Sequence, residues 1–82
     1  MKTNDPELIR LRKNIGGVLL SKRMEAADKI PQWEIADEVG ISQKYYGIIE
    51  RGEKMPSYGL MWKLAKAYGM TLSELTKLIE NY

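Results

Sequence analysis

The sequence predicts an all-α fold, a bundle of about five short helices in one domain. Apolar residues recur at three- and four-residue spacings along most of the chain, which is the period of an amphipathic helix. Residues that cap helix N-termini precede these stretches, and glycines follow them. No segment alternates β-branched and polar residues as strands do, and no linker or internal repeat divides the 82 residues. We therefore expect a single domain over residues 1–82 with one modest core.

The first helix is expected over about residues 5–27, as an extended N-terminal helix. Asp5 can cap it, and Pro6 suits the first helical position. The pair Gly16-Gly17 interrupts the apolar pattern. It leaves two interpretations, a close approach by another helix or a break into two helices. The residues expected on the buried stripe are Leu8, Leu11, Ile15, Val18 and Leu19.

Two short helices joined by a tight turn are expected next. The first begins near Pro31 or Gln32 and ends at Gly40, a candidate left-handed cap. Ser42 can cap the following helix, over residues 42–50, before Gly52 ends it. Their expected inward residues are Ile35, Ala36, Val39, Tyr46 and Ile49.

The last two helices have equally clear N-terminal signals. Ser57 can cap the fourth helix, which Gly69 ends. Thr71 and Glu74 have the spacing of a capping box at the start of the fifth. The expected inward residues of the fourth helix are Leu60 or Met61, Leu64, Ala65 and Tyr68, and the fifth helix is expected to run through Leu75, Leu78 and Ile79 to the C-terminus.

The composition argues against an enzyme. The chain has no cysteine and no histidine, so disulfides, thiolate metal sites and the commonest general base are missing. We expect no catalytic residue, no metal and no cofactor. No apolar run reaches the roughly 18 residues that span a bilayer, and the first five residues do not open a signal peptide. A soluble, cytoplasmic protein is expected.

The charge is weakly basic but unevenly distributed. The formal net charge of +2 is below the strongly basic balance typical of nucleic-acid binders. The segment from Arg10 to Arg23 contains five basic residues and no acidic one, whereas Glu34, Asp37 and Glu38 cluster later. We interpret most of these charges as solvated surface.

A series of short motifs follows at regular intervals in the middle of the chain. They are Gln32 at the start of the second helix, Ile35-Ala36 within it, Gly40-Ile41-Ser42 at the turn, Ile49-Glu50-Arg51-Gly52 at the end of the third helix, Pro56-Ser57 after the loop, and Leu64-Ala65-Lys66-Ala67-Tyr68-Gly69 in the fourth. Together they resemble the Cro/cI-type (XRE-family) helix-turn-helix domains of phage repressors and bacterial regulators, over about Ile15 to Leu75. The resemblance implies a lambda-repressor-like five-helix bundle whose third helix enters the major groove of DNA.

The resemblance also indicates which residues read bases. By position, Gln43 and Lys44 are the first candidates, and their side chains can bond adenine and guanine edges respectively. The alternative is an ordinary solvated first helical turn. Gly47 and Ile48 occupy the next outward positions, where the family commonly has polar residues. Gly47 could admit DNA close to the helix backbone, and Ile48 could contact a thymine methyl group or a protein partner.

Phosphate contacts form a second expected layer. By resemblance, Gln32 is expected to hold a phosphate at the start of the second helix; the alternative is a polar residue that merely begins the helix. Tyr45 can present its hydroxyl group to the DNA backbone, whereas Tyr46 is expected in the core. Arg51 and Lys54 flank the end of the third helix and are either phosphate contacts or plain surface charges.

Glu50 is expected to be structural. The resemblance places an acid at this position and pairs it with Arg23 on the first helix. We expect a bidentate ion pair between the two helices. The alternative is an exposed Arg23 that donates to phosphate.

The tryptophans are expected in the core or at its edge, because large aromatic side chains are usually buried there. They are Trp33 and Trp62. If Trp62 is exposed instead, an apolar patch suited to dimerisation would comprise Trp62, Leu72, Leu75 and Ile79.

The resulting hypothesis is a small, non-enzymatic transcriptional regulator of bacterial or phage origin, repressor- or controller-like. It would bind a double-stranded DNA operator as a homodimer, with half-sites about one helical turn apart. The alternative is a protein-interaction module or antitoxin-like partner that keeps the fold with weak or no DNA readout. The modest charge and the apolar Ile48 favour that alternative.

Overall fold

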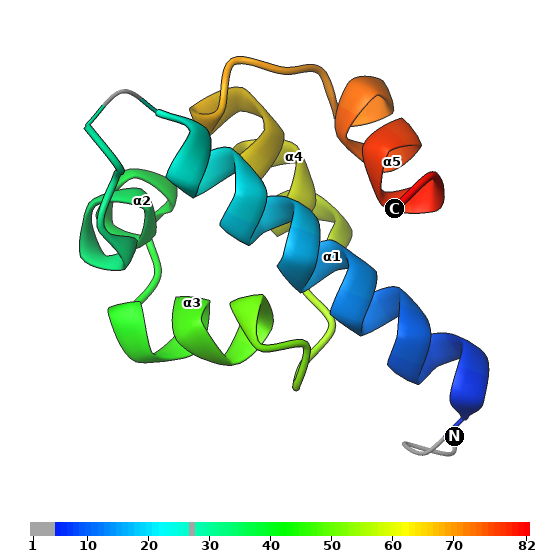
Figure 1. The fold of residues 1–82 in the computed structure, drawn as a ribbon. Coiled ribbons are helices and arrows are strands. Elements are labelled where there is room, and N and C mark those ends of the chain that lie inside the picture. The colour runs from blue at the N-terminus through cyan, green and yellow to red at the C-terminus, as the bar shows by residue number, and fades with distance from the viewer. Residues whose placement is uncertain (1–4, 27) are drawn as a thin grey trace.

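The protein folds into five α-helices (Figure 1). The structure, a computed structural model, describes residues 5–26 and 28–82. Within these ranges there is no strand, which confirms the all-α prediction. The helices are α1 (Pro6–Glu25), α2 (Gln32–Val39), α3 (Gln43–Glu50), α4 (Tyr58–Ala67) and α5 (Leu72–Glu80).

Local capping sets the helix boundaries as predicted. The Asp5 carboxylate accepts hydrogen bonds from the backbone N–H groups of Glu7 and Leu8 at the start of α1. Side-chain caps also begin α3, α4 and α5, the last with the complete capping box. The helix α1 ends at Glu25, before the expected end at residue 27, because Ala26 is extended. Residue 27 itself lies outside the described residues, as do residues 1–4 of the segment that was not expected to open a signal peptide.

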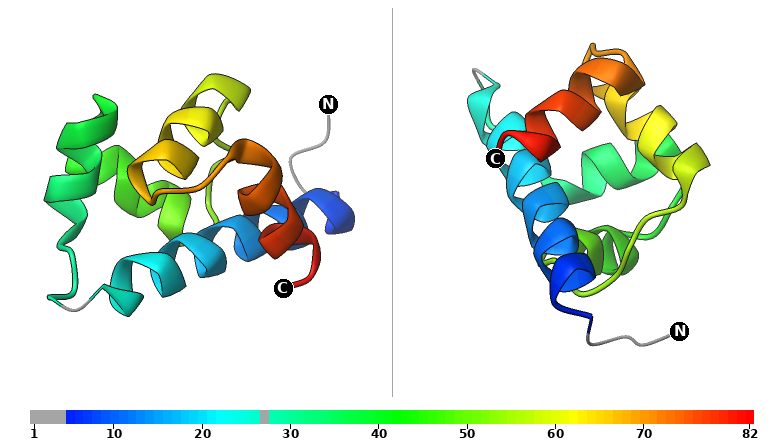
Figure 2. Two further views of the ribbon diagram at one scale, coloured as in Figure 1. Left: turned by 90° about the horizontal axis from the view of Figure 1, so that it is seen from above. Right: turned by 90° about the vertical axis from the view of Figure 1, so that its right-hand side faces the viewer.

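The helix α1 runs unbroken through its two glycines along one side of the bundle (Figures 1 and 2). Gly16 is buried against the end of α3: a Cβ atom at Gly16 would lie 2.8 Å from the carbonyl carbon of Glu50 and 3.0 Å from the carbonyl oxygen of Ile49. Of the two interpretations, close approach by another helix is therefore correct. The helices pack in a closed ring of neighbours, in the order α1, α3, α2, α4, α5 and back to α1.

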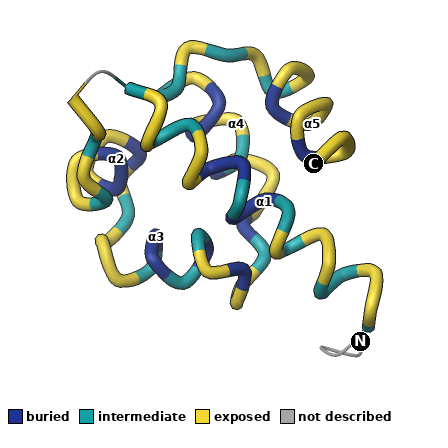
Figure 3. The backbone as a smooth tube through the Cα atoms, viewed as in Figure 1, coloured by how far each residue is buried: buried dark blue, intermediate teal, exposed yellow. Residues whose placement is uncertain are grey.

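The core lies inside this ring (Figure 3). It contains nearly every residue expected to point inward. Leu11 is an exception, 38% exposed, because the N-terminal turns of α1 extend past the other helices (Figure 1). The buried apolar residues are Ile15, Val18, Leu19, Ile35, Ala36, Val39, Tyr46, Ile49, Leu60, Leu64, Ala65, Leu75 and Ile79.

Two expectations about apolar surface are wrong. Trp33 and Trp62 are 57% and 48% exposed, because smaller neighbours on their helices fill the core. The Trp62 ring instead lies under the Lys66 ammonium group, 4.3 Å from the ring centroid. Leu75 and Ile79 face the core, since α5 packs against both α1 and α4. These two residues therefore cannot form part of a surface patch.

None of the described helices is both long and apolar enough to cross a membrane.

Candidate nucleic-acid interface

The helices α2 and α3 form a compact unit around a three-residue turn. Gly40 has the left-handed backbone conformation, with φ 79°, which glycine adopts at no steric cost. The N–H of Ile41 then donates to the carbonyl oxygen of Ala36 and closes the end of α2. The Ser42 hydroxyl accepts from the N–H of Tyr45 and starts α3 in a new direction. The first turn of α3 is thereby held at the surface, with Gln43 and Lys44 exposed.

The start of α2 and the outer side of α3 meet at one shallow pocket. Five of the residues expected to contact DNA line it, namely Gln32, Gln43, Lys44, Gly47 and Arg51. They come from two helices and from the residue that ends α3, so the fold brings together side chains that are dispersed in the sequence. Amide groups and two cations provide mainly hydrogen-bond donors, which suits an anionic, hydrogen-bonding partner.

The remaining candidates lie outside this pocket. Tyr45 and Ile48 are half-buried, and Tyr45 packs against the edge of the core. Lys54 is exposed in the loop that follows α3.

Gly47 differs from its expected outward position, because it is buried. A Cβ atom there would lie 3.2 Å from Nη1 of Arg51 and 3.5 Å from Oε1 of Gln32. Gly47 is therefore the floor of the pocket, beneath the side chains of Gln32 and Arg51.

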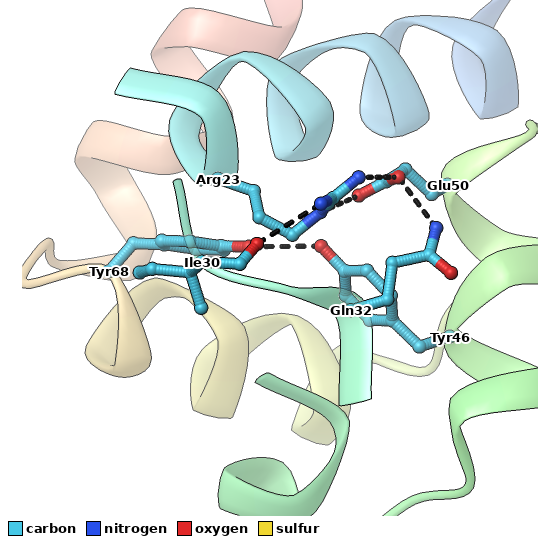
Figure 4. Close-up of polar contacts among 6 residues, drawn as sticks. All are labelled: Arg23, Ile30, Gln32, Tyr46, Glu50 and Tyr68. Atoms are coloured by element: carbon cyan, nitrogen blue, oxygen red, sulfur yellow. Dashed lines mark hydrogen bonds and ion pairs between the residues drawn. The ribbon is translucent and has the colours of Figure 1, made fainter. Parts of the chain in front are cut away.

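Arg23 and Glu50 form the expected ion pair beneath this surface (Figure 4). The guanidinium group donates from Nε and Nη2 to the two carboxylate oxygens, at 2.9 and 2.6 Å. Its Nη1 donates to the carbonyl oxygen of Ile30 at 3.1 Å. The Arg23 side chain is only 13% exposed, so the alternative of an exposed phosphate donor is wrong. Arg23 joins α1 to α3 and to the segment before α2.

Gln32 takes part in the same network, which the sequence did not reveal. Its Nε2 donates to Oε1 of Glu50 at 2.8 Å (Figure 4). Burial by itself raises the pKa of the Glu50 carboxyl group, but hydrogen bonds from Arg23 and Gln32 outweigh it and hold that pKa below its ordinary value. The carboxylate therefore stays charged and fixes the side chain of Gln32 at the edge of the pocket.

A pair of tyrosine hydroxyl groups lies next to this network. Tyr46 on α3 and Tyr68 after α4 are 2.9 Å apart at their oxygens (Figure 4). Burial raises the pKa of both phenols, so the pair remains neutral and polar within the core. The sequence placed both residues on inward faces, but it did not show that they meet.

The start of α2, which supplies Gln32 to the pocket, has no side-chain cap. Pro31 directly precedes Gln32. Uncapped N–H groups at a helix N-terminus, together with the helix dipole, favour a phosphate group. Arg51 supplies positive charge nearby; it is 60% exposed and bonded to Glu53 through Nε and Nη2.

Two short helices, a glycine turn and an exposed polar first turn on the second helix define a helix-turn-helix protein. The family model described as Helix-turn-helix matches residues 20–75, and the chain belongs to this family of DNA-binding transcriptional regulators. The family members are regulators and not enzymes. Among the described residues, no cluster of three or more acidic side chains could hold a metal ion.

Solved structures agree with this assignment. Two crystal structures of the clp gene regulator ClgR from Corynebacterium glutamicum are similar to this chain, each with 25% sequence identity over 87% of it. The TM-scores are 0.78 and 0.76, and the match covers 73% and 90% of the respective ClgR chains. A search of curated proteins gives no match.

Proposed function

We propose that this protein binds double-stranded DNA sequence-specifically as a small repressor- or controller-like regulator, with α3 in the major groove. The observation that carries the proposal is that five candidate residues line the same pocket. They are Gln32, Gln43, Lys44, Gly47 and Arg51. The pocket joins the exposed first turn of α3 to the N-terminus of α2. This arrangement supports base contacts from one element and backbone contacts from the other.

The roles of the side chains follow from their positions. Gln43 and Lys44 are exposed on the first turn of α3 and would read base edges. Gln32 and Arg51 would hold phosphates on either side of them. Lys54 would add a more distant phosphate contact.

The half-buried side chains have marginal roles. Tyr45 would offer its hydroxyl group to the DNA backbone. Ile48 would contact at most a thymine methyl group, since it is half-buried beside the pocket.

The regulator would act as a homodimer on a two-fold symmetric operator. A single domain with net charge +2 gains little from phosphates alone, so a second copy would supply much of the affinity. Of the residues expected at the dimer interface, Trp62 and Leu72 remain available, because Trp62 is exposed and Leu72 is half-buried. The bacterial source of the similar ClgR structures supports action in a bacterial cytoplasm.

Binding to random duplex DNA across a salt series tests the proposal. Arg51 and Lys54 predict that the logarithm of the binding constant falls with the logarithm of salt concentration, with a slope of roughly −2 per protomer. A flat and negligible response would exclude DNA binding through this surface.

Base readout is tested separately by Gln43→Ala and Lys44→Ala. Each variant should lose roughly 1–3 kcal/mol of preference for the operator over random DNA, measured by competition in fluorescence anisotropy. Equal losses on both DNAs would assign the residue to the phosphate backbone instead.

A protein-interaction module is the second candidate, and exposed aromatic residues favour it. Tyr58 and Trp62 lie four residues apart on α4 and are 79% and 48% exposed, so they share one helix face. Under this alternative, serine at either position would abolish partner binding. The salt response on DNA would be flat.

A further inference from the structure

Gly47 lies in the middle of α3, where a glycine destabilises a helix relative to alanine. It is buried although no backbone of another helix lies near it; the nearest atoms to a Cβ atom at this position belong to the side chains of Arg51 and Gln32. Gly16 differs, because its nearest atoms belong to the backbone of α3. Tight packing between helices therefore explains Gly16 but not Gly47.

The two side chains above Gly47 are each held from their far side. Nε2 of Gln32 donates to Glu50 at 2.8 Å, which leaves its Oε1 toward Gly47. Arg51 is bonded to Glu53 through Nε and Nη2, at 3.2 and 3.4 Å, which leaves Nη1 over Gly47. Both groups therefore close over the helix backbone at the one position without a side chain.

We propose that Gly47 is a positioning residue for DNA backbone contacts: its missing Cβ lets Arg51 and Gln32 lie against α3, where both reach the same phosphate region. A Cβ atom 3.2 Å from Nη1 of Arg51 would force the guanidinium group outward by a few tenths of an ångström. This inference rests on the proposed function. It replaces direct base contact by Gly47 with an action through its neighbours.

The variant Gly47→Ala tests this directly. Thermal unfolding should be unchanged or shifted upward, because alanine favours the helix and the displaced group is a flexible side-chain end. Affinity for random duplex DNA should nevertheless fall roughly fivefold, and the salt slope should become shallower by up to about 1 per protomer. A residue with only a structural role would not change the salt slope while leaving stability intact.

Gly59→Ala is the matched control. Gly59 is also helical, and a Cβ atom there meets nothing within 4 Å. This variant should gain stability and leave DNA affinity and salt slope unchanged.

A double-mutant cycle with Arg51→Ala identifies the route of the effect. Because Nη1 of Arg51 is the nearest atom to a Cβ atom at Gly47, we expect the effect to run mainly through Arg51, so adding Gly47→Ala to Arg51→Ala should cause less than a twofold further loss. A full fivefold further loss, unchanged affinity of Gly47→Ala, or its thermal destabilisation would each overturn the inference. Wild-type protein that fails to bind DNA would overturn the proposed function itself, whereas wild-type binding with an unaffected Gly47→Ala would overturn this inference alone.

Discussion

At the scale of single residues, Glu50 links three helices through one carboxylate. It ends α3 and accepts hydrogen bonds from Arg23 on α1 and from Gln32 at the start of α2. Its side chain is 6% exposed, so its interactions are weakly screened by solvent. The same group therefore stabilises the fold and orients a candidate phosphate contact.

Replacing Glu50 with glutamine should lower the free energy of unfolding by about 1–3 kcal/mol at pH 7, because a buried guanidinium group loses its counter-charge. The effect should depend on pH. The pKa of Glu50 is lowered in the folded protein from an ordinary value of 4.5. The stability from its charge is therefore present above pH 4.5 and is lost as pH falls through the lower folded pKa. Wild-type protein should lose more stability than Glu50→Gln between pH 7 and pH 3, in urea unfolding followed by circular dichroism.

Glu25→Gln provides the control for this measurement. Glu25 pairs with Lys22 at 3.4 Å, and its side chain is 62% exposed. Exposed pairs of this kind contribute little, so the variant should follow the wild-type pH dependence. Parallel pH profiles for wild type and Glu50→Gln would contradict a stabilising charge at Glu50.

At the scale of helices, the adjacent glycines of α1 should respond in opposite directions to alanine. Gly16→Ala places a methyl group against the backbone of α3 at Glu50, and overpacking of this kind costs about 1–3 kcal/mol beyond the helix gain. The three atoms nearest to a Cβ atom at Gly17 all belong to the phenol of Tyr82, a residue that is 64% exposed and can move aside. Gly17→Ala should gain up to about 1 kcal/mol from helix propensity. Thermal unfolding of both variants measures the difference; similar destabilisation of both would exclude the close packing of α1 on α3.

The helix boundaries were predictable from the sequence because capping depends on a few adjacent residues. Asp5, Ser42, Ser57 and Thr71 all cap as predicted. Burial was less predictable where it depends on neighbouring helices. Leu11 has the right spacing for the core, but no helix covers it fully.

The burial of the tryptophans and of α5 was also not predictable from the sequence. The apolar character of Trp33 and Trp62 suggested burial, but the core is formed by other residues and both tryptophans are exposed. Leu75 and Ile79 could be placed on a helix but not oriented, since their burial requires α1 and α4 on either side.

The candidate site was predictable in part: the exposed residues could be placed from the sequence, but the contacts between helices could not. The exposure of Gln43 and Lys44 follows from the cap at Ser42 and the helical period. The burial of Gly47 does not, because it depends on how the side chains of Gln32 and Arg51 fold over α3. The spacing of Glu50 and Arg23 gave their pairing only through the resemblance to a known family.

At the scale of the whole molecule, α3 and α5 lie on opposite sides of α1 (Figure 1). If α3 lies in the major groove of DNA, α5 and the adjoining face of α4 therefore stay uncovered. Tyr58 of α4 and Leu72 of α5 line one depression on that face. The proposed dimer would use this face, which lets two copies present their α3 helices to the same side of a duplex.

The spacing of half-sites tests this arrangement. Selection from a random duplex library should return a two-fold symmetric sequence with half-site centres about 10 base pairs apart. Inserting about 5 base pairs at the centre turns the half-sites to opposite faces of the duplex, so affinity should fall to that of a single half-site. The Leu72→Ser variant should bind the intact operator as weakly as the wild-type protein binds the operator with the insertion, because the dimer contact is lost in both cases. If wild-type protein selects an asymmetric single site, and the insertion has no effect, the chain binds DNA as a monomer.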